Sequence, residues 1–314
     1  MSINKLYTKL IIESIISRKP LRISYVSRDL IRFARMNKVL YLLGYYDKRI
    51  RDSRVWLMLN KRCKEQRRVI IEIAQIAESL GVDILIVKTL KPFKYAPDDI
   101  DILVINNEDH SVFINSLLKR GYILHKKGTP EVTLRRLVNG IIIDLDIHVK
   151  MGAGPYEYID KHYLWKRRIY KELDSMKIPV PNDVDELLIM SAHAIMKEFM
   201  ITIADITHIL FLDGTMIMKA KKQSTYIGLS QALQTILRLT DRIINLQCKD
   251  KACPVREYEY QIEFPVKVPI TTIICTYLEN LKYRLKIHGL RPINELMKAP
   301  SSKGTKTILR YLGI

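Results

Sequence analysis

Cysteine and acidic residues are scarce in this sequence. Its 314 residues include four cysteines, and 33 Asp and Glu stand against 52 Lys and Arg, which gives a formal net charge of +19. Four cysteines are too few for the disulfide framework of a small secreted domain. Cys248 and Cys253 could pair or bind a metal, but no second Cys or His pair at metal-ligand spacing follows them. We therefore expect thiols that are reduced or optionally paired.

Glycine, proline and long apolar runs are scarce as well. Twelve Gly and 12 Pro exclude a collagen-like or linker-dominated chain, and 48% hydrophobic residues exclude wholesale disorder. Charged side chains and histidines interrupt the most apolar stretch, residues 187–218. No run of about 18 apolar residues is left that could span a bilayer, and the N-terminus has no signal core. These absences predict a soluble, cytoplasmic globular protein.

The positive charge is concentrated in residues 1–80, which contain 18 Lys and Arg but only seven Asp and Glu. A basic excess of this size indicates a polyanionic partner, either nucleic acid or an anionic membrane surface. A thermophile-like surface, rich in Lys and Arg for ion-pair networks, is the alternative origin. Such networks need acidic partners, which this segment lacks, so we expect the protein to bind a polyanion.

Hydrophobic periodicity divides the chain into three regions. Residues 1–65 are predicted to be a basic helical region, residues 66–150 an α/β core and residues 151–314 a helical C-terminal domain. The fold class that follows is α+β, in which a small mixed β-sheet is flanked by N-terminal and C-terminal helical regions.

Within these regions the pattern predicts individual elements. Asn139-Gly140 between two strand-like runs predicts a hairpin with a type I′ turn. Strands are expected over 82–88, 99–105, 132–138 and 141–149, and helices over 30–43, 53–80, 108–120, 183–245 (two or three) and 270–287, with a basic helix over 164–173.

The predicted strands carry acidic residues at a spacing of two. Asp99 and Asp101 share one face of their strand, as do Asp144, Asp146 and His148 on the last strand. Carboxylates gathered on neighbouring strands repel one another, and a divalent cation relieves that repulsion. Hard oxygen ligands select Mg²⁺ or Mn²⁺. The alternative is a solvent-facing acidic side on each strand, which is common for one Asp pair and less so for two adjacent strands.

The spacing of these acids resembles a known superfamily. Lys88-Thr89 end a strand ten residues before Asp99, Asp-x-Asp follows on the next strand, and a third acid lies on a later strand. This order resembles the DNA polymerase β-like nucleotidyltransferase superfamily. Within it, the chain looks most like a branch of uncharacterised, largely prokaryotic nucleotidyltransferases whose first strand ends in Lys-Gly. That branch has an acid and a His two residues apart, as Asp146 and His148 are.

The helical part of that branch carries a His followed downstream by an Asp, which His193 and Asp205 resemble. A core histidine with hydrogen bonds is the alternative reading of His193, and also of His208. The resemblance covers about residues 66–215.

The resemblance implies an Mg²⁺- or Mn²⁺-dependent, two-metal nucleotidyl transfer from an NTP to an acceptor. Asp99 and Asp101 would bridge two metals. Asp146, with Asp144 in reserve, would bind the metal that activates the attacking hydroxyl.

Further residues would contact the nucleotide, for instance ATP. Lys88 and Thr89 would touch the triphosphate, and Lys197 would reach its phosphates unless it is an exposed helix lysine. The basic N-terminal helices favour RNA, such as tRNA, as the acceptor, while a protein hydroxyl stays open. The superfamily usually has Gly-Ser or Gly-Gly at this strand end, and the branch has Lys-Gly, so Thr89 stands where the branch has glycine. Its β-branched side chain restricts the approach of phosphate to the backbone. The alternative function is therefore a non-catalytic, basic nucleic-acid-binding protein on a degenerate nucleotidyltransferase fold.

Overall fold

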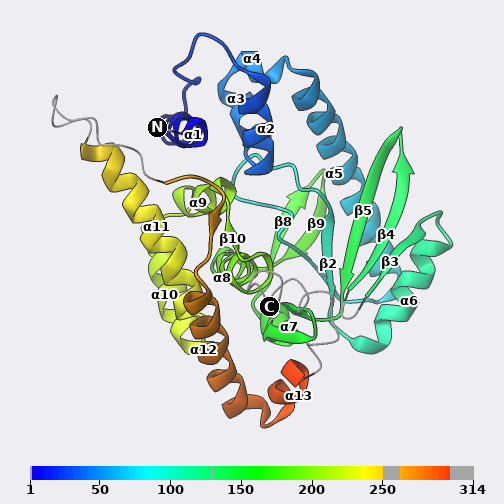
Figure 1. Cartoon of the computed structure of the whole chain (residues 1–314). Coiled ribbons are helices and arrows are strands. Elements are labelled where there is room, and N and C mark those ends of the chain that lie inside the picture. The colour runs from blue at the N-terminus through cyan, green and yellow to red at the C-terminus, as the bar shows by residue number, and fades with distance from the viewer. Residues whose placement is uncertain (1, 129–130, 250–261, 298–314) are drawn as a thin grey trace.

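The structure, a computed structural model, describes residues 2–128, 131–249 and 262–297. It has the predicted α+β class: a five-stranded mixed sheet with helices before and after it in the chain (Figure 1). Cys253 and the side chain of Cys248 lie outside the described part, so the prediction for this pair stays a prediction. Among the described helices, none is both long enough and apolar enough to cross a bilayer.

The N-terminal region consists of helices packed on one another. The predicted helix over 30–43 is two helices, because Lys38 adopts a left-handed conformation (φ 59°) and turns the chain. The predicted helix over 53–80 is continuous and ends at Gly81, whose φ of 67° suits a glycine. The helices are α1 (Ile3–Ser17), α2 (Arg28–Met36), α3 (Leu40–Tyr46), α4 (Lys48–Arg51) and α5 (Arg54–Leu80).

The sheet has the strand order β1-β2-β5-β4-β3. Strands β2 and β5 pair in parallel, and the other neighbours are antiparallel. Asn139 (φ 50°) and Gly140 (φ 76°) join β4 to β5 in a two-residue hairpin, as the type I′ prediction requires. The elements are β1 (Ile84–Val87), β2 (Ile100–Val104), α6 (Asn107–Leu118), β3 (Ile123–Lys127), β4 (Glu131–Val138) and β5 (Ile141–His148).

The two faces of the sheet have different partners. Ile102 and Ile147 lie in a core with α5 and α6, on the side that Figure 1 shows at the right of the molecule. On the opposite face, Leu85 and Leu103 belong to a second core that contains residues of both the N-terminal and the C-terminal helices. Because side chains alternate along a strand, Asp101 shares the face of Leu103 and therefore points towards the helices.

The described part of the C-terminal region is helical apart from three short two-stranded sheets. The predicted basic helix over 164–173 is wrong in its second half, because α7 ends at Lys166 and residues 169–173 form strand β8. Asp174 and Ser175, both with positive φ, make the tight turn into β9 that favours a hairpin here. These first elements are β6 (Met151–Ala153), β7 (Tyr156–Ile159), α7 (Lys161–Lys166), β8 (Ile169–Leu173) and β9 (Met176–Val180).

Most of the remaining helices lie on the opposite side of the molecule from the five-stranded sheet. The first of them, α8, lies in the centre, between the others and the sheet (Figure 1). They are α8 (Asp183–His193), the π-helix η1 (Ala194–Glu198), α9 (Ile203–Leu210), α10 (Gly214–Tyr226), α11 (Ser230–Lys249), α12 (Ile270–His288) and α13 (Arg291–Met297), with the strand pair β10 (Met200–Ile201) and β11 (Val266–Lys267). The proposed division at residues 65 and 150 stays a prediction; helix α5 continues across the first boundary.

Candidate metal and nucleotide site

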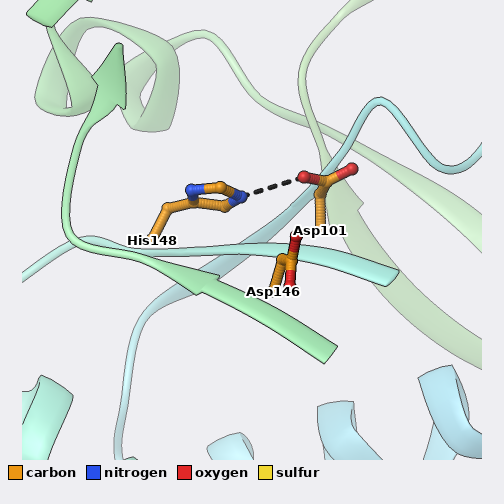
Figure 2. Close-up of side chains that lie close together, drawn as sticks. All are labelled: Asp101, Asp146 and His148. Atoms are coloured by element: carbon orange, nitrogen blue, oxygen red, sulfur yellow. Dashed lines mark hydrogen bonds and ion pairs between the residues drawn. The ribbon is translucent and has the colours of Figure 1, made fainter. Parts of the chain in front are cut away.

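Two carboxylates meet on neighbouring strands of the sheet. Asp101 on β2 and Asp146 on β5 are direct partners in the parallel register. His148, two residues further on, lies on the same face. Each of the three offers a ligand atom, and these atoms all lie within 4.8 Å of one another (Figure 2). Parallel pairing of period-two strands thus brings Asp101, Asp146 and His148 to one face of the sheet.

Asp101 is the most buried carboxylate of this cluster and has two basic neighbours. Its Oδ1 lies 2.5 Å from Lys88 Nζ and 2.9 Å from His148 Nε2. Burial opposes ionisation of Asp101, but Lys88 and His148 outweigh it and hold the pKa of this carboxyl well below its usual range. The Asp101 carboxylate therefore stays ionised beside the Lys88 ammonium.

The end of β1 is held by contacts within the protein. Thr89 is buried; its hydroxyl donates to the carbonyl of Val87 (3.0 Å) and accepts from the Asp101 amide (3.2 Å). The Lys88 amide donates to the Glu186 carboxylate (3.2 Å), and Lys88 has a φ of 56°. The Thr89 hydroxyl, which was predicted to touch a triphosphate, is thus already engaged, as is the Lys88 amide, while Lys88 Nζ faces the carboxylates.

Asp99 precedes β2 and lies near this cluster without joining it. It is half-buried, and it is not among the residues whose ligand atoms lie within 4.8 Å of one another. Burial, followed by the charges of Asp101 and Asp146, raises the pKa of Asp99 to about 7. A divalent cation would relieve this repulsion, so the carboxylates fit an oxygen-preferring metal in their chemistry.

Asp144 and Asp146 have different partners along β5. Asp144 forms a bidentate ion pair with Arg135, at 2.7 Å for both hydrogen bonds. Asp146 accepts a hydrogen bond from the Thr133 hydroxyl (2.7 Å) and is the residue opposite Asp101. Of the two acids considered for the third position, the structure brings Asp146 to Asp101.

Glu131 is a member of the site that the sequence analysis missed. Its Oε2 lies 3.1 Å from Lys197 Nζ and 3.7 Å from His148 Nδ1. Burial opposes ionisation, but Lys197 and His148 lower the pKa of Glu131 to about 2. The two-residue turn at Asn139-Gly140 was the available signal, because it fixes the hairpin register that sets Glu131 opposite His148.

The histidines and the acid predicted from the helical region are not members of the three-residue cluster. His193 Nε2 is 3.1 Å from Glu198, and burial lowers the pKa of His193 to about 3. Asp205 forms a capping box with Thr202 at the start of α9. His208 is buried as expected of a core histidine, but neither ring nitrogen has a hydrogen-bond partner among the described residues.

Comparison with known proteins adds little. No protein-family model matches the chain, and no curated protein matches it. Among solved structures, the chain is similar to an antigenic nucleotidyltransferase-like protein from Paracoccidioides brasiliensis, with a TM-score of 0.41 and 15% identity over 63% of this chain and 98% of that chain. Similarity at this level carries no argument about function. Function is inferred from the geometry of the site.

Proposed function

We propose that this protein is a divalent-metal-dependent nucleotidyltransferase that transfers a nucleoside monophosphate from an NTP to a hydroxyl of an acceptor. The observation that carries the proposal is the pair Asp101 and Asp146 on adjacent parallel strands, with His148 beside them and their ligand atoms within 4.8 Å. Asp99, whose ionisation is suppressed by burial and then by this pair, is the third carboxylate that would hold the metal. Mg²⁺ or Mn²⁺ suits these oxygen ligands.

Each protein group has a separate task in this proposal. A bound metal would polarise phosphate oxygens and favour deprotonation of the acceptor hydroxyl. His148 and Thr133 orient Asp101 and Asp146 through hydrogen bonds, as groups behind metal ligands commonly do. Lys88 Nζ, 2.5 Å from Asp101 Oδ1, would contact the triphosphate.

The finer part of the proposal is that the acceptor is RNA. The support is the net charge of +19 and its concentration in the first 80 residues, since Lys and Arg supply most non-specific affinity for phosphate. A second candidate is a nucleic-acid-binding protein without activity. The engaged Thr89 hydroxyl and Lys88 amide favour it, because neither donor is free for a phosphate.

Transfer of label from each α-³²P-labelled NTP to total RNA, with Mg²⁺ or Mn²⁺, tests the proposal. We expect labelled RNA with the native protein and at least about a 100-fold lower rate for Asp101→Asn and Asp146→Asn, which lose ligands of the proposed metal. Asp144→Asn is the matched control on the same strand and should keep most of the rate.

Two outcomes reject the proposal. One is the absence of transfer from any NTP to RNA, protein or small hydroxyl compounds. The other is equal transfer by native protein and Asp101→Asn, which would trace the activity to a contaminant.

A further inference from the structure

Helix α2 presents a row of arginines to solvent. Arg28, Arg32 and Arg35 are four and three residues apart, so they lie on one side of this nine-residue helix, and all three are exposed. Within the described part of the chain, no ion pair joins any of them to an acidic residue. We call these three residues the α2 arginine row.

Three arginines of helix α5 differ from this row because acidic residues pair with them. Helix α5 is also basic in its first half, but three of its four arginines have carboxylate partners 2.9–3.5 Å away. The pairs are Arg62 with Asp98, Arg67 with Asp174 and Arg68 with Glu65. The positive charge of the α2 arginine row is left for a partner outside this part of the chain.

The end of α2 is fixed against the start of α9. Asn37 is buried and binds the start of α9: its side-chain oxygen accepts from the Ile203 amide (3.4 Å) and its carbonyl from the Ala204 amide (3.2 Å). The next residue, Lys38, is exposed and follows Arg35 by three residues. Lys38 therefore adds a fourth exposed cation at the end of the row.

The opposite side of α2 argues against a membrane partner. Leu30, Phe33 and Ala34, the apolar residues of the helix that face inward, are at most 3% exposed. A helix that lies in a membrane interface needs an apolar face free to enter the lipid. Here that face is buried in the protein, so the row fits a polyanion that binds from solution.

We propose that the α2 arginine row, continued by Lys38, binds the phosphodiester backbone of a polynucleotide acceptor. The identity of the reaction rests on the proposed function, whereas the binding itself does not. Arginine suits this task because its guanidinium contacts phosphate in a bidentate manner and stays charged.

Binding of a fluorescent single-stranded RNA, and of DNA of the same sequence, tests the proposal across a salt series. The full chain is used with Asp101→Asn, so that no turnover disturbs the equilibrium. We expect Arg28→Gln/Arg32→Gln/Arg35→Gln to weaken RNA binding at least about tenfold and to reduce the slope of log affinity against log salt by about 2. Stronger binding of RNA than of DNA would identify the acceptor as RNA. Equal binding of the two would show that the row accepts either polynucleotide.

The matched control removes the same charge elsewhere. Lys219, Lys221 and Lys222 are exposed on α10, and their triple change to Gln should alter affinity by less than about threefold. Replacing the three arginines by Lys keeps the charge and should retain most of the binding, which also verifies that the helix is folded. Equal losses in both Gln triples, no loss in the arginine triple, or competition by phosphatidylserine vesicles but not by RNA would overturn the proposal.

Failure of this inference and of the proposed function are distinguishable. If RNA binding depends on the row but no nucleotide is transferred, the proposed reaction falls and the binding surface stands. If transfer depends on Asp101 while the arginine triple binds and reacts as the native protein does, the reaction stands and the surface falls.

Discussion

Lys88 is the single residue that most affects how the site can bind a cation. Its Nζ is 2.5 Å from Asp101 Oδ1, and both side chains are largely buried. Asp101 pulls the pKa of Lys88 above its usual value against the effect of burial, so this ammonium stays charged. Lys88 thus competes with a metal for Asp101, and a metal must displace or share that contact.

We expect Lys88→Met to bind Mn²⁺ more tightly in the absence of nucleotide. Removal of one positive charge this close to a ligand should lower the dissociation constant about tenfold. Electron paramagnetic resonance of free Mn²⁺ during a titration measures this constant. Lys161→Met is the matched control, because Lys161 is also buried but bonds to the Val104 carbonyl and Asn107. Unchanged or weaker Mn²⁺ binding by Lys88→Met would contradict this account of the site.

Residues of the site differ in how well sequence alone predicts them. Asp101 and Asp146 follow from the period of two, which fixes the face of a strand. Prediction of Glu131 requires the register of the β4–β5 hairpin, which depends on both the type of turn and the pairing of the two strands. The engagement of the Thr89 hydroxyl depends on a turn at the end of β1 that no local pattern encodes. Contacts across the chain, such as Lys88 to Glu186, are set only when the helices pack on the sheet.

Among the elements, the short helix α4 depends on one buried carboxylate. Asp47 accepts hydrogen bonds from the amides of Arg49 (3.0 Å) and Leu21 (3.1 Å), and its carboxylate pairs with the Arg49 guanidinium (2.6 Å). It thereby caps α4 and fixes the loop that leads from α1 to α2. Burial opposes ionisation of Asp47, but these bonds outweigh it and lower its pKa below the usual value.

We expect this carboxylate to make the protein sensitive to acid. Because its pKa is lower in the folded than in the unfolded chain, its stabilisation is complete above about pH 4 and is lost as the pH falls through the folded-state value. Asp47→Asn should lower the free energy of unfolding at pH 7 by about 1–3 kcal/mol and flatten its decline below pH 4. Urea unfolding from pH 3 to 7 measures both, with exposed Asp52→Asn as the control. An unaltered acid profile in Asp47→Asn would refute the assignment.

Element boundaries were predicted best where local chemistry determines them. The Asn139-Gly140 turn and the Gly81 cap are examples, because only a few residues adopt positive φ readily. The break at Lys38 was missed, since a lysine rarely takes that conformation and the contact of Asn37 with α9 stabilises it from a distance. Strand β8 was missed because Lys171, Glu172 and Leu173 also suit a helix.

At the scale of the whole molecule, helix α12 is tied to the start of the C-terminal region through buried polar contacts. Arg284 is 2% exposed and pairs with Glu157 on β7 (3.1 Å) and Glu295 on α13 (2.7 Å). Asn280, one turn earlier, donates to the Tyr158 carbonyl (3.1 Å). The bonds to Glu157 and Tyr158 join segments more than 120 residues apart, which periodicity cannot foresee.

Loss of the buried guanidinium should therefore destabilise the entire fold. We expect Arg284→Met to lower the free energy of unfolding by about 3–5 kcal/mol, because two buried carboxylates lose their counter-ion. Arg291→Met removes an exposed partner of the same Glu295 and should cost less than about 1 kcal/mol. Chemical denaturation of both variants gives the comparison, and similar losses would show that Arg284 contributes no more than a surface charge.

The length of helix α5 has a consequence for substrate choice. It is a continuous helix of 27 residues, about 40 Å long, whose first half contacts α3 and whose second half lies under the sheet. Such a continuous helix would keep the N-terminal helices at a constant distance from the carboxylates. A polynucleotide held on α2 would then be modified at a fixed count of nucleotides from its point of attachment. Strands too short to bridge that distance would bind without reacting.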